Sequence, residues 1–306
     1  MRVFVTGATG FIGSVIVREL IEAGHQVLGL ARSNAAAASL TSVGAEVHRG
    51  ALDDLDSLRS GAAASDGVIH AAFMNEAVRS GPSAFAEAGR AEQRAIEAIG
   101  AVLAGSGRPF VVTSGTGLVS PGRLLTEEDT PDTSSAAAVR VPRNPEVALE
   151  LSARAVRVSV VRLPLSVHGE GDHGFVPALV SIARAKGVSA YPGDGLNRWP
   201  SVHRKDAAHL FRLALESAKA GSRFHAVADE GVPVREIAGV IGRHLGVPVV
   251  SLPVEEAGDH FGWLGRFFSM DCPASSALTR ERLGWYPVQP GLLADLDQDH
   301  YFKERE

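Results

Sequence analysis

Three glycines near the start of the chain have a spacing that suits the binding of phosphate groups: Gly7, Gly10 and Gly13. The apolar run Arg2–Thr6 before them is typical of a strand buried on both faces, and Phe11–Ala23 has the spacing of an amphipathic helix. Gly7 allows a tight turn, Gly10 lets a phosphate approach the backbone, and Gly13 lets helix and strand pack closely. We therefore expect free N–H groups at the positive end of the helix to face the pyrophosphate of a dinucleotide.

The end of the second apolar run indicates which dinucleotide binds. A protein that prefers NAD carries Asp or Glu about twenty residues beyond the turn, where it bonds the ribose 2′-hydroxyl. Ala31 stands there and leaves room for a phosphate, while Arg32 offers a guanidinium and Ser33 a hydroxyl that also suits a helix N-cap. The pattern predicts NADP(H), with NAD(H) the less favoured cofactor. The alternative is that Arg32 is only a solvated charge.

Two histidines in the second half of the chain are candidates for acid–base catalysis. His168 and His173 flank a glycine-rich loop, and an imidazole that titrates near neutral pH can donate a proton. The alternative for each is a structural or solvated role. The eleven histidines include no pair at metal-ligand spacing on a helix, and no acidic cluster accompanies them, so we expect no metal.

An aromatic region with few charges suggests where substrate binds. Phe175, Arg198 and Trp199 are candidate substrate contacts, and they suit an apolar or aromatic carbonyl compound better than a nucleotide sugar. Packing in the protein core is the alternative for all three.

Composition limits the class of protein. The chain has 306 residues, 45% of them hydrophobic, which suits one large domain or two with an ample core. A net charge of −5 argues against nucleic acid or an anionic membrane as the partner. Cys272 is alone, so no internal disulfide forms. No signal segment or bilayer-length apolar run is visible, and we expect a cytoplasmic protein.

Alternating elements predict the architecture. Short apolar strands are expected at 26–30, 46–48, 67–71, 109–113 and 156–163, with helical patterns between them that include 84–103 and 145–154. This alternation predicts an α/β fold with a doubly wound parallel sheet of the Rossmann type. We place a dinucleotide-binding domain at 1–165 and a smaller substrate lobe at 166–306, whose elements can interleave. The lobe has helical patterns at 206–217, 234–245 and 291–302, and Asp206 is expected to cap the first of these.

The whole chain resembles the extended short-chain dehydrogenase/reductase superfamily, which includes sugar-nucleotide epimerases and dihydroflavonol reductases. The matching segments occur in the expected order over nearly all of the chain: Gly7–Gly13, Val68–Ala72, Val111–Gly117, Val161–Pro164 with Val167–Gly169, Val202–Ala208 and Leu283–Pro287. Each segment alone is weak evidence, whereas six in order are specific.

The resemblance implies further roles for individual residues. It adds to the cofactor contacts Thr9, Phe11, Ile12, Ala71, Ala72 and Pro164. Near the adenine, relatives usually carry Asp where this chain has Ala51, so Leu52 or Asp53 is expected to serve instead. At the end of the fifth strand the family keeps a hydroxyl that bonds the substrate carbonyl. Ser114 and Thr116 are the candidates, Thr116 being nearer the family position, and the alternative for either is a hydroxyl bonded only to the backbone. The loop with His168 and His173 lines the substrate pocket in relatives, and His203 lies in a segment that contacts substrate or packs beside it.

One expected catalytic pair does not match. The family's proton donor is a Tyr with a Lys four residues later, on the helix before the 156–163 strand. Those places fall near Val139 and Arg143, and none of the three tyrosines has a Lys four positions on. Arg143 can take the place of the Lys, or it is a plain surface residue. The chain is therefore identified as an atypical member of the superfamily.

These observations support one leading hypothesis and two alternatives. The leading one is an NADP(H)-dependent oxidoreductase that reduces a carbonyl, C=N or C=C bond of a small, largely apolar molecule with a non-standard proton donor. A non-catalytic NADP-binding redox sensor or regulatory protein comes second, and a sugar-nucleotide epimerase or dehydratase third. The 84–103 helix can be core or dimer surface, so monomer and homodimer stay open.

Overall fold

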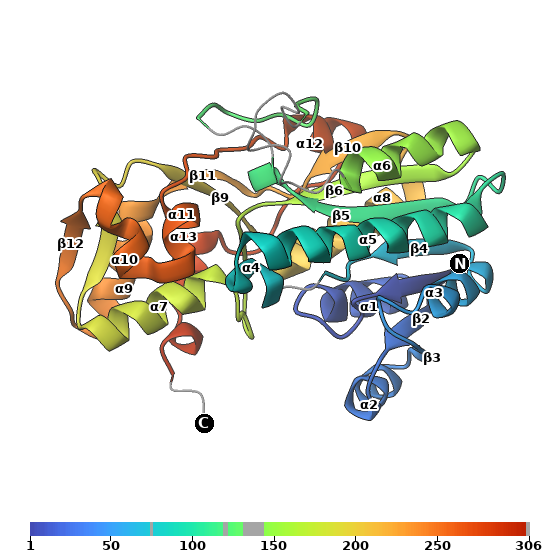
Figure 1. Cartoon of the computed structure of the whole chain (residues 1–306), viewed down its shortest axis with the longest axis horizontal. Coiled ribbons are helices and arrows are strands. Elements are labelled where there is room, and N and C mark those ends of the chain that lie inside the picture. Colours follow the sequence, from blue (N-terminus) through green and yellow to red (C-terminus); the bar gives the residue numbers. More distant parts are fainter. Residues whose placement is uncertain (74–75, 119–121, 131–143, 304–306) are drawn as a thin grey trace.

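The largest sheet of the protein has seven strands, all parallel, in the order β10-β6-β5-β4-β1-β2-β3. A computed structural model describes residues 1–73, 76–118, 122–130 and 144–303 (Figure 1). The strands are β1 (Arg2–Thr6), β2 (Gln26–Ala31), β3 (Glu46–Arg49), β4 (Gly67–His70), β5 (Pro109–Gly115), β6 (Arg157–Leu163) and β10 (Ser222–His225). The strand order reverses between β1 and β4, as in doubly wound nucleotide-binding sheets. The predicted fold class is confirmed.

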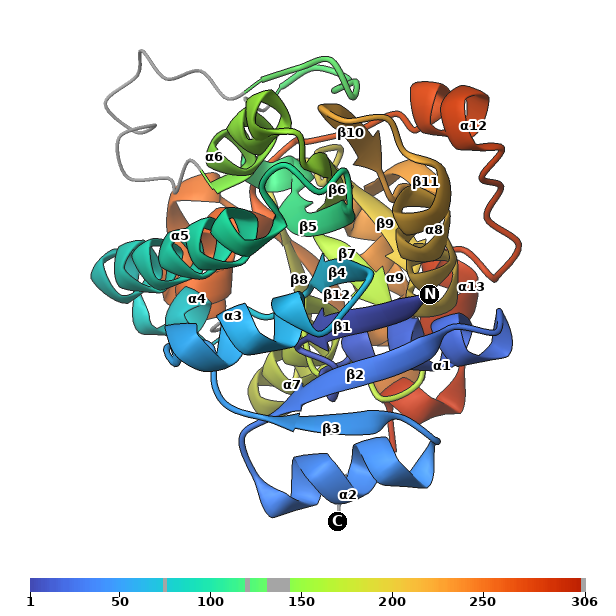
Figure 2. The same cartoon turned by 90° about the vertical axis from the view of Figure 1, so that its right-hand side faces the viewer.

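Helices cover both faces of this sheet (Figure 2). One face carries α1 (Gly13–Glu22), α2 (Asn34–Ser42) and α8 (Arg204–Ser217). The other carries α3 (Leu55–Ala63), α5 (Pro82–Leu103) and α6 (Asn144–Glu150), and the short α4 (Glu76–Ser80) precedes α5. Because strand side chains alternate between the faces, Val3 and Val5 pack on the α1 face while Phe4 packs on the α5 face. The strands are thus buried on both sides, as their unbroken apolar runs predict.

The second half of the chain adds two small sheets. One holds β11 (Asp229–Pro233), β9 (Arg198–His203) and β7 (Ser166–His168), and the other β12 (Val249–Leu252) and β8 (Ser189–Pro192). Their helices are α7 (Phe175–Lys186), α9 (Val234–Leu245), α10 (Ala257–Phe261), α11 (Gly265–Phe268) and α13 (Leu292–Leu296), whereas α12 (Ala277–Leu283) packs against β10 and α8 of the larger part. A separate apolar core forms among α7, α9, α10, α11 and α13, on the left of Figure 1.

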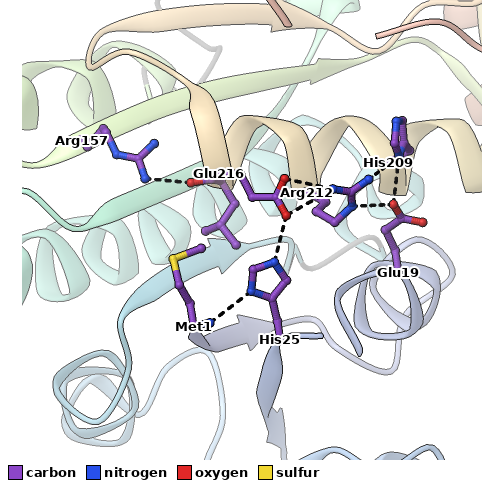
Figure 3. Close-up of polar contacts among 8 residues, drawn as sticks. Met1, Glu19, His25, Arg157, His209, Arg212 and Glu216 are labelled. Atoms are coloured by element: carbon purple, nitrogen blue, oxygen red, sulfur yellow. Dashed lines mark hydrogen bonds and ion pairs between the residues drawn. The ribbon is translucent and has the colours of Figure 1, made fainter. Parts of the chain in front are cut away.

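The two parts of the chain interleave, because α8 and β10 follow residue 165 but belong to the larger sheet and its cover. An ionic network fixes α8 against α1 (Figure 3). Arg212 Nε and His209 Nδ1 lie 2.8 Å and 2.9 Å from Glu19 Oε1, and Arg212 Nη1 lies 2.9 Å from Glu216 Oε2. His25 Nε2, just before β2, donates to Glu216 at 2.9 Å. The domain boundary at 165 stays a prediction.

Two local expectations are wrong for tertiary reasons. The ring of His203 caps α8 by accepting from Lys205 N, whereas the buried carboxylate of Asp206 accepts from the backbone N–H groups of Val288 and Gln289 at 3.0 Å each. The segment 291–302 is also not one helix.

That segment contains α13 and a separate 3-10 turn, Asp299–Tyr301. Gln298 between them has extended backbone, with φ −94° and ψ 146°. Tyr301 is held by distant bonds, since Gly169 N donates to its hydroxyl and the hydroxyl donates to Asp295. These tertiary hydrogen bonds override the local tendency to form one helix, which the spacing of the apolar residues indicates.

Candidate functional site

The turn between β1 and α1 is shaped by its glycines. Gly7 has φ +69°, a conformation that favours glycine, and a Cβ there would lie 2.6 Å from Ala71 O. A Cβ on Gly13 would lie only 1.9 Å from Gly7 O, so any side chain would push α1 off the turn. A Cβ on exposed Gly10 would approach only Gly7 O, at 3.2 Å. The roles expected for Gly7 and Gly13 follow directly from this geometry.

The start of α1 is open in a way that the neighbouring helices are not. Ser33 Oγ caps α2 by accepting from Ala36 N at 3.1 Å, and Asp54 Oδ1 caps α3 by accepting from Ser57 N at 3.0 Å. Among the described residues, no side chain caps α1. The N–H groups of Ser14 and Val15 donate to the carbonyls of Gly10 and Ile12, so an anion would be held by the N–H groups that precede Ser14 and by the positive end of the helix dipole. This arrangement fits the pyrophosphate of a dinucleotide, beside exposed Thr9 and half-buried Phe11 and Ile12.

Buried polar groups at the end of β4 bond to the strand that leads into the turn. His70, at the end of β4, lies 2.9 Å through Nδ1 from the hydroxyl of Thr6, and Ala72 N donates to the same hydroxyl at 3.4 Å. Complete burial lowers the pKa of His70 to about 4, so this ring is neutral at physiological pH. Ala71 and Ala72 thus lie directly against the turn, at the point where the strand order reverses. Sequence reasoning gave no role to His70.

The ends of β2 and β3 present two arginines. Arg32 is exposed, and Arg49, opposite Ala31 in the register of β2 and β3, donates to Asn34 Oδ1 at 2.9 Å. Sequence reasoning did not select Arg49, because only the parallel pairing of β2 with β3 brings it beside Ala31. Asp53 is exposed and Leu52 is half-buried against the core. This end of the sheet therefore carries two cationic side chains that a 2′-phosphate can attract.

The ends of β5 and β6 hold buried polar atoms that lack partners. Among the described residues, Ser114 Oγ, Thr116 Oγ1 and Arg162 Nη2 have no hydrogen-bond partner. Ser114 and Arg162 face each other in the register of β5 and β6, and alternation from Val112 and Val160 places them on the α5–α6 face. Such atoms mark a place where water or a ligand completes the bonding. Arg143 lies outside the described residues.

A buried cluster of charged and polar side chains lies next to Ser114 and was not predicted from the sequence. Arg162 Nη1 lies 3.3 Å from His225 Nε2, and His225 Nδ1 lies 2.8 Å from Ser275 O. Because a carbonyl only accepts, Nδ1 carries the proton and Nε2 accepts from the guanidinium. Burial lowers the pKa of Arg162 to about 10 and also lowers that of His225. Buried Glu127 completes the cluster by accepting from the hydroxyl of Thr279 at 2.6 Å.

His168 is fully buried, and its Nδ1–H donates to Asp295 at 2.8 Å. Its ring lies 5.5 Å from that of His203, and its Nε2 has no partner among the described residues. His173 is exposed, with its ring 5.6 Å from that of Phe11. The structure therefore brings His168 and His203 together and places His173 over the dinucleotide turn. Their role in proton transfer stays a prediction.

Arg204, which sequence reasoning missed, links the lobe to the turn. Its guanidinium lies 4.5 Å from the ring of Phe11, donates to Ser14 Oγ at 3.0 Å and donates to the carbonyl of Glu170 at 2.7 Å. The glycine-rich loop is thereby fixed against the start of α1. Pro164, buried just after β6, begins the connection into this region.

Two of the three aromatic-region candidates, Phe175 and Trp199, share one aromatic cluster, whereas Arg198 is held in an ion pair. Phe175 contacts Trp199, Trp263 and Phe267, with ring centroids 5.1–5.7 Å apart. Trp199 is fully buried and donates through Nε1 to Phe267 O. Arg198 forms a two-bond pair with Asp271, at 3.0 Å for each bond. Substrate contact by any of them stays a prediction.

Comparisons with known proteins identify the class. The model of the NAD dependent epimerase/dehydratase family matches residues 3–227, and the chain belongs to this family. An uncharacterized protein of Schizosaccharomyces pombe is 51% identical over 99% of this chain and all of its own length. A 2-alkyl-3-oxoalkanoate reductase of Stenotrophomonas maltophilia is 28% identical over 82% of this chain and 77% of its own. MoeE5 in complex with UDP-glucose and NAD has the same fold, with TM-score 0.76, 24% identity, and coverage of 99% and 98% of the two chains.

No described helix is long and apolar enough to cross a membrane. No group of three or more His, Cys, Asp or Glu side chains in the described part could hold a metal ion.

Proposed function

We propose that the protein is an NADP(H)-dependent oxidoreductase that reduces a carbonyl, or a related C=N or C=C bond, in a small and largely apolar molecule. The observation that carries the proposal is the uncapped start of α1 beside a turn in which Gly13 leaves no room for a side chain. The turn would hold the pyrophosphate through backbone N–H groups of Phe11 and Ile12. The bound dinucleotide would supply the hydride.

The preference for the phosphorylated cofactor rests on the ends of β2 and β3. Ala31 carries no carboxylate where an acidic residue would bond a ribose hydroxyl, and the two arginines, Arg32 and Arg49, can pair with a 2′-phosphate. An NAD-binding relative with the same fold, MoeE5, supports the nicotinamide dinucleotide and leaves the choice between the two forms to this chain's own residues.

The reacting group would bind beside the unpartnered hydroxyls of Ser114 and Thr116. A hydroxyl there can donate to a carbonyl oxygen and hold it near the nicotinamide. The reductase from Stenotrophomonas maltophilia supports a keto group as the target, since its name describes an oxoalkanoate. The buried charge of Arg162 would stabilise a developing alkoxide from behind this site.

A sugar-nucleotide epimerase or dehydratase, the third hypothesis from the sequence, becomes the second candidate here because the family match and the UDP-glucose complex of MoeE5 favour it over the sensor. The third, a redox sensor without turnover, requires only the dinucleotide turn. The three functions differ in what the protein does with its bound cofactor.

Absorbance at 340 nm tests the proposal directly. NADPH oxidation would be followed at this wavelength with panels of aromatic and aliphatic ketones and imines. UDP-glucose conversion with NAD would be followed by analysis of the sugar product, because epimerisation or dehydration leaves no net reduced cofactor. We expect turnover of apolar ketones, reduced by Ser114→Ala or Thr116→Ala and unchanged by the exposed Thr41→Ala. Conversion of UDP-glucose alone would establish the second candidate. NADPH binding without turnover on the panels would establish the sensor.

A further inference from the structure

Glu92 interrupts the buried face of α5. The residues that follow it on this face, Ala95, Ile96, Ile99 and Leu103, pack in the core under the sheet, whereas Glu92 carries a carboxyl and is only 8% exposed. Lys, Glu, Arg and Asp are almost never this buried unless a partner compensates them. Packing alone does not explain the choice of a carboxyl at this position.

The position of Glu92 along α5 places it at the carboxyl edge of the sheet. Because α5 connects two parallel strands, it runs antiparallel to them, and it begins at the edge of the sheet where β4 and β5 end (Figure 1). Phe85 contacts Phe73, three residues past β4, with ring centroids 5.8 Å apart. Ile96 already packs on the sheet. Glu92 lies between Phe85 and Ile96 along α5, on the helix that covers the sheet face to which Ser114 belongs.

Asn144, the first residue of α6, orients this carboxyl. Its Nδ2 lies 2.5 Å from Glu92 Oε2 and 3.0 Å from Gly89 O. A carbonyl oxygen only accepts, so this atom is the amide nitrogen and Oε2 of Glu92 is an acceptor. When the carboxyl is protonated, its proton is therefore on Oε1. Asn144 also follows Arg143, the position that the resemblance gives to the Lys of the missing catalytic pair.

Burial raises the pKa of Glu92 to about 7, and the hydrogen bond from Asn144 lowers it in part. No charged group contributes to this shift. Among the side chains that the structure describes, the ionisable ones on the helices packed against α5 are Asp56 and Arg59 of α3, Arg79 of α4, and Glu146 and Glu150 of α6. A carboxyl that titrates near neutral pH is suited to general acid catalysis.

We propose that Glu92 donates the proton in the reduction, in place of the missing Tyr, and that Asn144 is its positioning residue. The role rests on the proposed function. The carbonyl carbon accepts a hydride from the reduced nicotinamide, which becomes oxidised. The O–H bond of Glu92 breaks, its proton passes to the carbonyl oxygen to complete the alcohol, and the carboxylate regains a proton from solvent. Ser114 would hold the same oxygen.

Glu92→Gln tests the donor. A neutral carboxyl and an amide have nearly the same shape, and Asn144 can still donate to the Gln oxygen, so the variant should fold. We expect kcat for NADPH oxidation with 9,10-phenanthrenequinone and acetophenone to fall about 100-fold or more, with the NADPH dissociation constant unchanged. Glu97→Gln is the matched control, because Glu97 is an exposed carboxyl one turn away on α5, and it should change neither value.

Asn144→Leu tests the positioning role through the pH profile. The lost hydrogen bond favoured the charged form of Glu92, so the pH at which kcat/KM falls on the alkaline side should rise. A merely structural effect would lower the rate without moving this limb. Wild-type turnover that Glu92→Gln leaves intact would overturn the donor role and leave the proposed function standing. Wild-type protein that binds NADPH but reduces neither probe nor the ketone panel would overturn both.

Discussion

The dinucleotide turn and the ends of β5 and β6 lie at one edge of the same sheet but are specified in different ways. At the turn, the backbone geometry determines the site: Gly7 has a left-handed conformation, a Cβ on Gly13 would collide with the carbonyl of Gly7, and no described side chain caps α1. At the ends of β5 and β6, side chains decide, and Ser114 and Arg162 keep buried polar atoms without described partners.

This difference explains which part of the function can be derived from the chain alone. Few residue patterns can form a phosphate site from backbone groups. The same glycine spacing therefore occurs in proteins that catalyse different reactions. A catalytic site made of side chains can use several residue types for the same task, since a Tyr, a Glu or a His can each supply a proton. The turn therefore indicates the cofactor, whereas the reaction has to be derived from residues that only the fold brings together.

Substitutions at two glycines of the turn should have the largest effects that we expect. The two variants should differ in whether they also lower the stability of the fold. Gly10→Val should abolish NADPH binding in a folded protein, because Gly10 is exposed and its side chain would occupy the space of the pyrophosphate. Gly13→Val should lower the melting temperature as well, since its Cβ collides with Gly7 O. Calorimetric titration and thermal melts measure both. Retained NADPH affinity in folded Gly10→Val would place the phosphates elsewhere.

In the catalytic site made of side chains, to which we assign Glu92, the buried carboxyl of this residue should make the free energy of unfolding depend on pH. Its pKa is raised to about 7 in the folded state from an ordinary 4.5, so the folded state holds the proton longer and wild-type stability falls as pH rises through this window. We expect Glu92→Gln to match wild type near pH 4.5 and to exceed its free energy of unfolding by about 3 kcal/mol above pH 8. Denaturant titrations at both pH values check this, and a constant difference would contradict a buried, titrating carboxyl.

The cationic ends of β2 and β3 should decide between the two cofactors. Arg32→Asp should reverse or abolish the preference for NADPH over NADH by adding a repulsive carboxylate beside the 2′-phosphate. A change of about tenfold or more is expected, since bonds to charged groups are worth about 1.5–3 kcal/mol. Arg49→Ala should weaken NADPH binding less, because Arg49 is partly engaged with Asn34. Dissociation constants for both cofactors measure the effect, and an unchanged ratio in both variants would remove these arginines from the site.

The ionic network between α1 and α8 should give the smallest effect. Burial raises the pKa of Glu19, but hydrogen bonds from Arg212 and His209 outweigh it, so the net pKa is below its ordinary value. The stabilisation is therefore present above the ordinary pKa of a Glu and is lost as pH falls through the lowered one. Arg212→Met should cost about 1 kcal/mol or less at neutral pH, because partly exposed pairs are screened. The cost should shrink in high salt and in acid; an undiminished cost would indicate lost packing instead.

Much of the fold is predictable from the sequence. The strands of the large sheet and helix 234–245 follow from apolar periodicity and turn residues, which act locally. The role of Asp206 and the break at Gln298 were not predictable, because bonds to distant residues determine them. The same reason hides Arg49, Arg204 and the pair of Glu92 with Asn144. Each gains its meaning from a neighbour more than ten residues away.

Titration of the wild-type protein with NADPH and with NADH, followed by calorimetry under identical conditions, tests the central claim most directly. The account predicts one site per chain, with NADPH bound at least several-fold more tightly than NADH. Equal affinities, or no binding of either dinucleotide, would contradict it.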